Sequence, residues 1–218
     1  MTALIIVAAG RGERLGAPVP KALVDLAGRS LLDRCLEVAR TIPRISQVVV
    51  VAPAGLEEQV RVAVGATRAD VVAGAATRDG SVRAGLAAVD PPTRDVLVHD
   101  AARPLTPVEV FDRVLDALDE VTAVIPVMPV ADTIKRVRDG IVVGTPARDE
   151  LVAVQTPQGF RTGVLSQAHD ARSGEVTDDA MLVEQLGVPV HVVAGSPRAM
   201  KVTTSFDLAV AAGMLEES

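Results

Sequence analysis

The chain carries a glycine-rich loop followed by basic residues close to its first residue. The loop is Ala8-Ala9-Gly10-Arg11-Gly12-Glu13-Arg14-Leu15-Gly16, and the sequence continues to Pro20-Lys21. Glycines let backbone N–H groups approach a polyphosphate, while Arg14 and Lys21 add the positive charge that phosphates attract. The loop therefore predicts a phosphate-binding site, and its alternative is a tight glycine turn with solvated arginines.

Two other phosphate-binding motifs share features with this loop. Gly10, Gly12 and Gly16 resemble a dinucleotide fingerprint, which needs an acidic residue at the end of the second strand to hold ribose hydroxyls. The second predicted strand ends instead in Ala52-Pro53-Ala54. A Walker loop needs Lys followed by Ser or Thr, whereas Lys21 is followed by Ala22. Both motifs are therefore disfavoured.

A second candidate loop follows the apolar run at residues 96–98. It is His99-Asp100-Ala101-Ala102-Arg103-Pro104. Mg²⁺ prefers one or two carboxylates together with substrate oxygens and water. Asp100 is therefore the predicted metal ligand, with a turn or helix-cap aspartate as the alternative, whereas we expect His99 to be a packing residue.

Two further loops add weaker candidates. Gly74-Ala75-Ala76-Thr77-Arg78-Asp79-Gly80-Ser81 is rich in small residues, so its backbone groups could bind the edge of a base. Lys201 follows Gly195-Ser196-Pro197-Arg198-Ala199-Met200 and is a cation in an apolar setting. An ordinary surface charge is the alternative for Lys201.

The sequence offers no obvious nucleophile for covalent catalysis. It has three histidines, one cysteine (Cys35) that falls in a helical pattern, and no Gly-x-Ser-x-Gly elbow. Cations, Mg²⁺ and alignment are sufficient for phosphoryl or nucleotidyl transfer, where electrostatics and positioning supply most of the catalysis. The residues therefore favour that class of reaction.

Alternating strands and helices must position these loops. Strands are predicted at residues 4–9, 48–52, 71–72, 96–98, 123–127 and 190–193, and helices at 31–39, 56–64, 78–89, 107–120, 162–171, 177–187 and from 205. Thr106 and Glu109 predict a capping box, with Pro107 at the first helical position. This order predicts an α/β fold, a Rossmann-like, mostly parallel sheet with helices on both faces and ligands at the carboxyl ends of its strands.

The alternation stops after Pro129. Residues 133–138 alternate polar and apolar side chains, Asp139-Gly140 predicts a hairpin turn, and Ile141-Val142-Val143 follows. We predict an inserted β-hairpin arm at about residues 132–155. It is either a solvent-exposed excursion or an arm that reaches a second subunit or a substrate.

Length and composition limit the class of protein. The 218 residues predict one domain, residues 1–218, and the net charge of −6 with 1% aromatic residues disfavours nucleic-acid binding, which uses basic grooves and stacking rings. No uncharged run has the length of a membrane helix, so we expect no membrane partner. A lone Cys35 and the absence of a basic leader predict a cytoplasmic protein without a signal peptide.

The whole set of motifs resembles the 2-C-methyl-D-erythritol 4-phosphate cytidylyltransferase family, nearly from end to end. The motifs are the first loop, Pro20-Lys21, Val98-His99-Asp100-Ala101-Ala102-Arg103-Pro104, Asp132-Thr133, Thr156-Pro157-Gln158, Val176-Thr177-Asp178-Asp179 and Met200-Lys201-Val202-Thr203. The first loop fits any nucleotidyltransferase of this superfamily. The His-Asp-Ala-Ala-Arg-Pro run and the late Lys-Val-Thr are far more specific.

The resemblance implies an enzyme that transfers CMP from CTP to methylerythritol phosphate and releases pyrophosphate, in isoprenoid precursor synthesis, with Mg²⁺ on Asp100. It implies catalytic roles for Arg14, Lys21, Arg148 and Lys201, nucleotide binding by Ala8, Ala9, Gly10, Gly12, Ala75, Ala76, Ser81 and Ala101, and substrate binding by Arg103, Thr133, Arg148, Thr156, Thr177 and Lys201. It also implies a homodimer through the arm, in which Thr133, Arg148 and Thr156 serve the partner's site.

Three other functions stay open at this point. The chain could activate another polyol phosphate such as ribitol phosphate, act as a non-catalytic nucleotide-binding regulator, or, most distantly, be a dehydrogenase. Many relatives have Gly-Gly-Asp/Glu where this chain has Gly74-Ala75-Ala76, so a carboxylate contact to the base is absent here.

Overall fold

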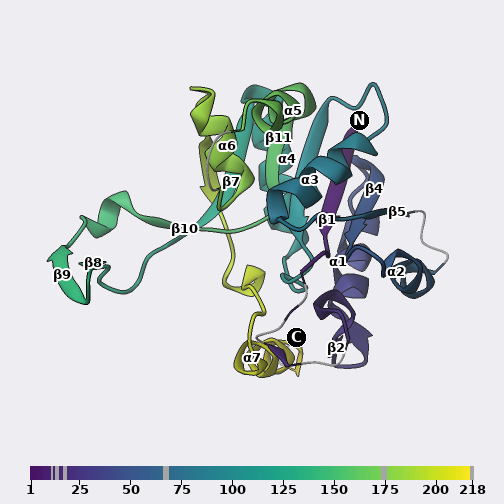
Figure 1. Ribbon diagram of the computed structural model, residues 1–218, viewed down its shortest axis with the longest axis horizontal. Coiled ribbons are helices and arrows are strands. Elements are labelled where there is room, and N and C mark those ends of the chain that lie inside the picture. Colours follow the sequence, from purple (N-terminus) through teal and green to yellow (C-terminus); the bar gives the residue numbers. More distant parts are fainter. Residues whose placement is uncertain (11, 13–14, 17–18, 66–68, 173–175, 217–218) are drawn as a thin grey trace.

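A computed structural model of the chain describes residues 1–10, 12, 15–16, 19–65, 69–172 and 176–216. Its centre is an eight-stranded sheet in the order β10-β7-β11-β6-β1-β4-β5, with β12 also paired to β7 (Figure 1). The strands are β1 (Thr2–Val7), β4 (Ile45–Ala52), β5 (Ala69–Ala73), β6 (Asp95–Asp100), β7 (Ala123–Pro129), β10 (Val152–Val154), β11 (Gln158–Arg161) and β12 (His191–Ala194).

The mostly parallel sheet that the sequence predicts is confirmed. β1 lies between β4 and β6 and is parallel to both, with Leu4 opposite Val48 on one side and Leu97 on the other. β11 is antiparallel to both β6 and β7, and β10 is antiparallel to β7. These two short strands were not predicted, because three or four residues are too few to show a clear period.

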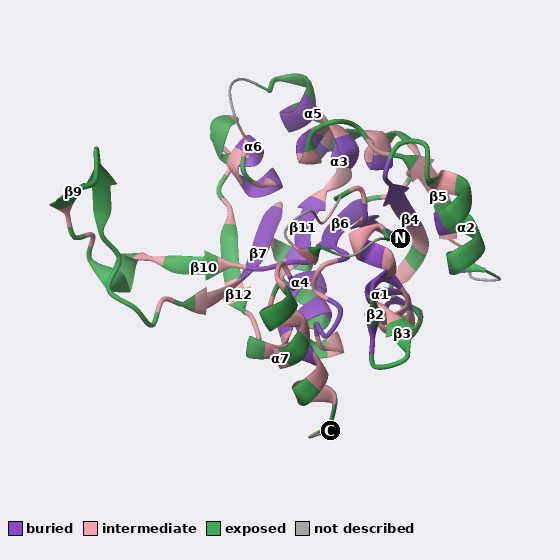
Figure 2. Ribbon diagram, turned by 60° about the horizontal axis from the view of Figure 1, so that its bottom comes forward, coloured by how far each residue is buried: buried purple, intermediate pink, exposed green. Residues whose placement is uncertain are grey.

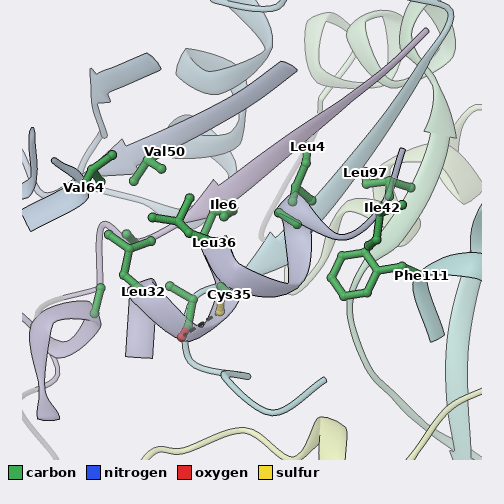
Figure 3. Packing of buried hydrophobic residues seen from close by; sticks show 14 of the residues in the cluster. Leu4, Ile6, Leu32, Cys35, Leu36, Ile42, Val50, Val64, Leu97 and Phe111 are labelled. Atoms are coloured by element: carbon green, nitrogen blue, oxygen red, sulfur yellow. Dashed lines mark hydrogen bonds between the residues drawn. The ribbon is translucent and has the colours of Figure 1, made fainter. Parts of the chain in front are cut away.

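Helices cover the two faces of the sheet. The helices are α1 (Leu31–Arg40), α2 (Glu57–Val64), α3 (Arg78–Ala87), α4 (Val108–Glu120), α5 (Thr162–Asp170), α6 (Asp179–Gln185) and α7 (Ser205–Glu216). One buried cluster joins Leu4 and Ile6 of β1 to α1, α2 and α4, including Leu36 and Phe111 (Figure 3). A second cluster joins Ile5 to α3, α5 and α6. Neighbouring residues of β1 therefore point to opposite cores, as expected for a strand buried on both faces.

Polar side chains cap the starts of four of these helices, α1, α3, α6 and α7. Ser30 accepts a hydrogen bond from the Asp33 amide at 3.0 Å, and Asp33 accepts one from the Ser30 amide, which is a capping box for α1. The capping box predicted for α4 is wrong. The Thr106 hydroxyl donates to the Arg103 carbonyl at 3.0 Å, and Pro107 is the N-cap without a side-chain cap bond.

The predicted hairpin arm is present and projects from the body of the molecule beyond β7 and β10 (Figure 1). β8 (Arg136–Arg138) pairs antiparallel with β9 (Ile141–Gly144). Asp139 and Gly140 both have positive φ, 50° and 76°, as the tight two-residue hairpin turn requires. Its apolar side chains Val137, Ile141, Val142 and Val143 are 56–68% exposed (Figure 2). None of the described helices is long and apolar enough to span a membrane.

Candidate active site

A cleft of about 1010 Å³ opens at the carboxyl ends of the parallel strands. Its walls come from the segments that follow β1, β4, β5 and β6, together with Lys21 and Lys201. The lining includes Ala8, Ala9, Gly10, Lys21, Ala75, Ala76, Arg78, Ser81, Asp100, Ala101 and Lys201. Four segments distant in sequence therefore meet in one cleft, because parallel strands all end at the same edge of the sheet.

The first loop forms one wall of this cleft. The Ala8 amide donates to the Val51 carbonyl at 2.9 Å, which holds the start of the loop against β4. Gly12 has φ +70°, and a Cβ placed on it would lie 2.6 Å from Cβ of Lys21, so only glycine fits there. This close approach fixes the stem of Lys21 at the cleft. The predicted catalytic residue Arg14 lies outside the described residues.

The small-residue loop before α3 is shaped by Ser81. The Ser81 hydroxyl accepts a hydrogen bond from the Ala75 amide at 3.0 Å and lies 2.9 Å from the Thr77 carbonyl, to which it can donate. Ser81 is only 1% exposed, and these two hydrogen bonds let its buried hydroxyl hold the loop in shape. A Cβ on Gly74 would lie 2.7 Å from Cβ of Ala9. The small-residue loop at residues 74–81, named the base loop from here on, is therefore in close contact with the first loop.

Asp100 is the last residue of β6 and lies between two cations. Its Oδ2 is 2.7 Å from Nζ of Lys201, and its Oδ1 is 3.4 Å from both Nε and Nη2 of Arg78. Burial alone would raise the pKa of Asp100, but the charges of Arg78 and Lys201 outweigh burial and lower it. Lys201 is thus placed at the cleft by a carboxylate, with 42% of its side chain exposed.

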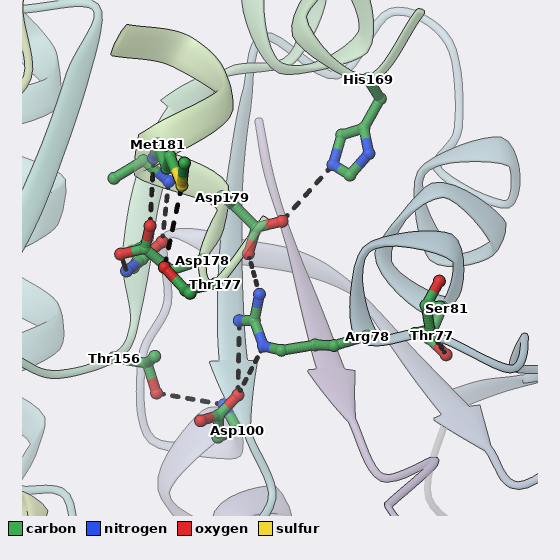
Figure 4. Close-up of polar contacts among 12 residues, drawn as sticks. Thr77, Arg78, Ser81, Asp100, Thr156, His169, Thr177, Asp178, Asp179 and Met181 are labelled. Carbon is green, nitrogen blue, oxygen red and sulfur yellow. Dashed lines mark hydrogen bonds and ion pairs between the residues drawn. The ribbon is translucent and has the colours of Figure 1, made fainter. Parts of the chain in front are cut away.

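Arg78 and Asp179 are the residues that sequence reasoning missed. Arg78 starts α3 and lines the cleft, and its Nη1 lies 2.7 Å from Oδ2 of Asp179, the first residue of α6 (Figure 4). Burial opposes the charge of Arg78, yet the two carboxylates together raise its pKa. The sequence signal was slight: Arg78 lies in the quoted base loop and Asp179 in the quoted Thr-Asp-Asp motif.

His99 is a packing residue, as predicted. It is 1% exposed, its Nδ1 is 3.1 Å from the Thr156 hydroxyl, and its ring centroid is 5.2 Å from that of Phe111. Burial lowers the pKa of His99 to about 4. The Thr156 hydroxyl also accepts from the Asp100 amide at 3.0 Å. Thr156 therefore supports the end of β6 in its own chain, and its role at a partner's site stays a prediction.

The guanidinium of Arg103, a predicted substrate ligand, donates hydrogen bonds to two backbone carbonyls in this structure. Its Nη1 donates to the Ala199 carbonyl at 2.6 Å and its Nη2 to the Val154 carbonyl at 3.2 Å. Val154 ends β10 at the base of the arm, and Ala199 lies two residues before Lys201. The guanidinium thus connects the base of the arm to the segment that carries Lys201.

The remaining predicted substrate ligands lie away from this cleft. Thr133 and Arg148 are exposed on the arm, and Nη1 of Arg148 donates to the Ala131 carbonyl at 3.0 Å. Thr177 is exposed before α6, with its hydroxyl 3.8 Å from the sulfur of Met181 (Figure 4). The chain by itself therefore brings the predicted metal ligand and the predicted nucleotide-binding residues other than Gly12 to one cleft, whereas Thr133 and Arg148 do not line it.

The donor set of the cleft fits a magnesium ion held mainly by phosphates. In the described part of the chain, Asp100 is the single carboxylate that lines the cleft, and no three His, Cys, Asp or Glu side chains gather as metal ligands. Mg²⁺ in such sites takes one or two carboxylates and completes its shell with phosphate oxygens and water. One carboxylate at the end of β6 satisfies that requirement.

Comparisons with known proteins agree on one family. The family model of 2-C-methyl-D-erythritol 4-phosphate cytidylyltransferase matches residues 2–217. The chain is 54% identical to the protein of that name from Frankia casuarinae, over 98% of this chain and 80% of the relative, and 49% identical to that of Rhodococcus opacus, over 98% and 94%. A solved 4-diphosphocytidyl-2C-methyl-D-erythritol synthase from Anaerococcus prevotii has a TM-score of 0.87 at 30% identity, covering 99% of this chain and 98% of that one.

Proposed function

Since this chain belongs to the 2-C-methyl-D-erythritol 4-phosphate cytidylyltransferase family, we propose that its cleft binds CTP beside methylerythritol phosphate. The enzyme transfers CMP from CTP to 2-C-methyl-D-erythritol 4-phosphate in isoprenoid precursor synthesis. Its cytoplasmic location stays a prediction from the sequence.

The nucleophile of the reaction is the substrate phosphate itself. A phosphate monoester has a second pKa of about 6, so at neutral pH it is mostly a dianion that needs no general base. One of its oxygens attacks the α-phosphorus of CTP in line, the new P–O bond forms, and the bond to the β-phosphate breaks to release pyrophosphate. The protein must therefore bring several anions together and stabilise the charge that moves to the leaving group.

Backbone and small side chains hold the nucleotide. Ala8, Ala9 and Gly10 contact the triphosphate, while Ala75 and Ala76 present main-chain groups to the cytosine edge. The close contact between Gly74 and Ala9 supports this assignment, because it sets the base loop and the first loop at a fixed separation. The hydroxyl of Ser81 keeps the Ala75 amide in place.

The cations divide into two groups around the reacting phosphates. Arg14 and Lys21 stabilise the triphosphate and the negative charge that develops during transfer. Lys201 and Arg148 orient the incoming phosphate. The 2.7 Å pair between Lys201 and Asp100 supports this role, since it keeps the ammonium at the cleft before substrate arrives.

Asp100 would hold a divalent cation together with the phosphates of CTP. When bound, Mg²⁺ supplies charge neutralisation and alignment of the triphosphate oxygens. Asp100 is ready for this task, because the charges of Arg78 and Lys201 lower its pKa and keep it ionised.

The arm completes the site of a second subunit in a homodimer. Its exposed valines and isoleucine would be an unusual surface for an isolated chain, which supports burial against a partner. Arg148 and Thr133 stand on this arm, away from the cleft of their own chain. They reach methylerythritol phosphate in the partner's cleft, so the dimer is required for activity.

The single observation that carries this proposal is the convergence of the segments after four parallel strands on one cleft with Lys21, Asp100 and Lys201. The test mixes the purified protein with CTP, Mg²⁺ and methylerythritol phosphate, and follows pyrophosphate and the cytidine diphosphate product. We expect both products in equal amounts. A panel with ribitol phosphate and other polyol phosphates follows under the same conditions, and faster turnover of any of these would overturn the substrate assignment.

A further inference from the structure

Asp179 is a buried carboxylate that the proposed mechanism leaves without a task. It is 0% exposed and begins α6 behind the cleft. One of its oxygens lies 2.7 Å from Nη1 of Arg78, and the other lies 3.4 Å from Nε2 of the buried His169 (Figure 4). A buried charge is expensive unless it is paired, so Arg78 is the partner that makes this position possible.

Arg78 connects this buried carboxylate to the cleft. Its guanidinium places Nη1 on Asp179, while Nε and Nη2 face Oδ1 of Asp100, both at 3.4 Å. The shorter contact is the one to Asp179. Asp179, on the buried side, therefore sets the orientation of the planar Arg78 guanidinium. That orientation decides which N–H groups of Arg78 face Asp100.

The orientation of Asp100 matters because the cleft takes anions. In the proposed function Asp100 would hold a divalent cation against the triphosphate, so the direction of its carboxylate must be set. Its ion-pair partners are Arg78 and Lys201, and the charge of Arg103 also acts on it. Lys201 has a 42% exposed side chain that the proposed mechanism turns toward the substrate phosphate. Once Lys201 turns away, Arg78 is the ion-pair partner of Asp100 that remains among the described residues.

We propose that Asp179 is a positioning residue, which acts through Arg78 to keep the Asp100 carboxylate oriented while Lys201 engages the substrate phosphate. This inference rests on the proposed function. The alternative is a purely structural pair that ties α3 to α6. The two roles predict different kcat values for a variant in which apolar side chains replace the pair and keep the melting temperature.

The experiment compares three variants with the wild-type enzyme. Asp179→Asn removes the charge at nearly the same volume. Arg78→Met with Asp179→Leu replaces the pair by apolar side chains, which often preserves or increases stability. Asp79→Asn is the matched control, because Asp79 belongs to the same helix turn and pairs with Arg172 at 2.7 Å, yet does not line the cleft. Melting temperature, CTP affinity, kcat and KM are measured for each.

For Asp179→Asn we expect kcat to fall at least about tenfold while CTP affinity changes less than about threefold. The double variant should melt close to the wild type and still lose at least about tenfold in kcat, whereas Asp79→Asn should stay within about twofold. Recovery of both melting temperature and kcat in the double variant would show that the pair is structural only. So would an unchanged kcat in Asp179→Asn.

A crystal structure of Asp179→Asn tests the inference without turnover. We expect the Arg78 guanidinium to leave Asp100 and the Asp100 carboxylate to rotate. Unchanged positions of both side chains would overturn the positioning role. A wild-type enzyme that releases no pyrophosphate would instead refute the proposed function, and the crystallographic comparison would still decide the role of Asp179.

Discussion

The ammonium of Lys201 lies 2.7 Å from Oδ2 of Asp100 at the mouth of the cleft. Asp100 ends the buried strand β6, whereas Lys201 lies in the segment between η4 (Pro197–Ala199) and α7. The Lys201 backbone is held nearby, because the Val202 amide donates to the Ala102 carbonyl at 2.8 Å. The pair therefore places a partly exposed cation next to a buried carboxylate, and a phosphate dianion can compete for that cation.

Replacing Lys201 by Met tests this cation. Lys201→Met removes the charge and keeps most of the apolar stem, so we expect kcat/KM for methylerythritol phosphate to fall on the order of 10²-fold. The control is Arg94→Met, since Arg94 is exposed at the opposite end of β6 from Asp100 and should leave turnover unchanged. Steady-state pyrophosphate release provides the measurement. Equal losses in the two variants would contradict a specific role for Lys201.

Mixing two impaired variants, at methylerythritol phosphate well below KM, tests whether the arm serves the partner's cleft. Lys201→Met damages the cleft and Arg148→Ala damages the arm, so a mixed dimer keeps one intact site that combines the good cleft with the good arm. After subunit exchange at equal concentrations, we expect activity to rise to about a quarter of the wild-type value. No rise after proven exchange would place Arg148 at the site of its own chain.

Arg148→Ala alone gives a second measure of the arm. Because Arg148 is assigned to the incoming phosphate, we expect KM for methylerythritol phosphate to rise by about tenfold or more, with CTP affinity nearly unchanged. Arg138→Ala is the matched control on the same exposed arm. Equal losses toward both substrates would count against this assignment.

The contact between the base loop and the first loop predicts a strict need for glycine at residue 74. In Gly74→Ala the new methyl would lie 2.7 Å from Cβ of Ala9 and 2.8 Å from the Ala52 carbonyl. We expect a loss of about 1–3 kcal/mol in the free energy of unfolding. CTP affinity should also fall, measured by calorimetry. Gly163→Ala is the control, since a Cβ there meets no atom within 4 Å and α5 should tolerate it.

The start of α7 predicts a pH-dependent contribution to stability. Hydrogen bonds from the hydroxyl and amide of Thr203, together with the Thr204 amide, lower the pKa of Asp207 to about 2. A carboxyl with a depressed pKa in the folded state stabilises at pH values above its unfolded pKa, about 3.9, and loses this as pH falls toward 2.

Asp207→Asn should therefore be less stable than the wild type by about 1 kcal/mol at pH 6, the usual size of a lost cap. We expect this difference to shrink as pH falls from about 4 to 2. Urea unfolding at each pH measures it. A difference that stays constant over that range would show that the ionised form of Asp207 carries no special stabilisation.

The sequence by itself determined the repeating strands and helices, the loops that follow the strands, and the hairpin arm. These features follow from local rules: apolar runs such as residues 4–7, helical periods, and the Asp139-Gly140 turn. Parallel topology then places those loops at one edge, so Lys21, Asp100 and Lys201 could be predicted as neighbours from motifs alone.

Only the tertiary structure decided which polar groups pair. Arg78 bridges Asp100 and Asp179, residues from β6 and α6, and no local period or spacing records that contact. Likewise Arg103 bonds to a backbone carbonyl and Thr156 to the Asp100 amide, contacts that no local pattern records, and their substrate roles stay predictions. Secondary structure depends on neighbours along the chain, whereas a buried charge must find whichever partner the packed fold brings within hydrogen-bond distance.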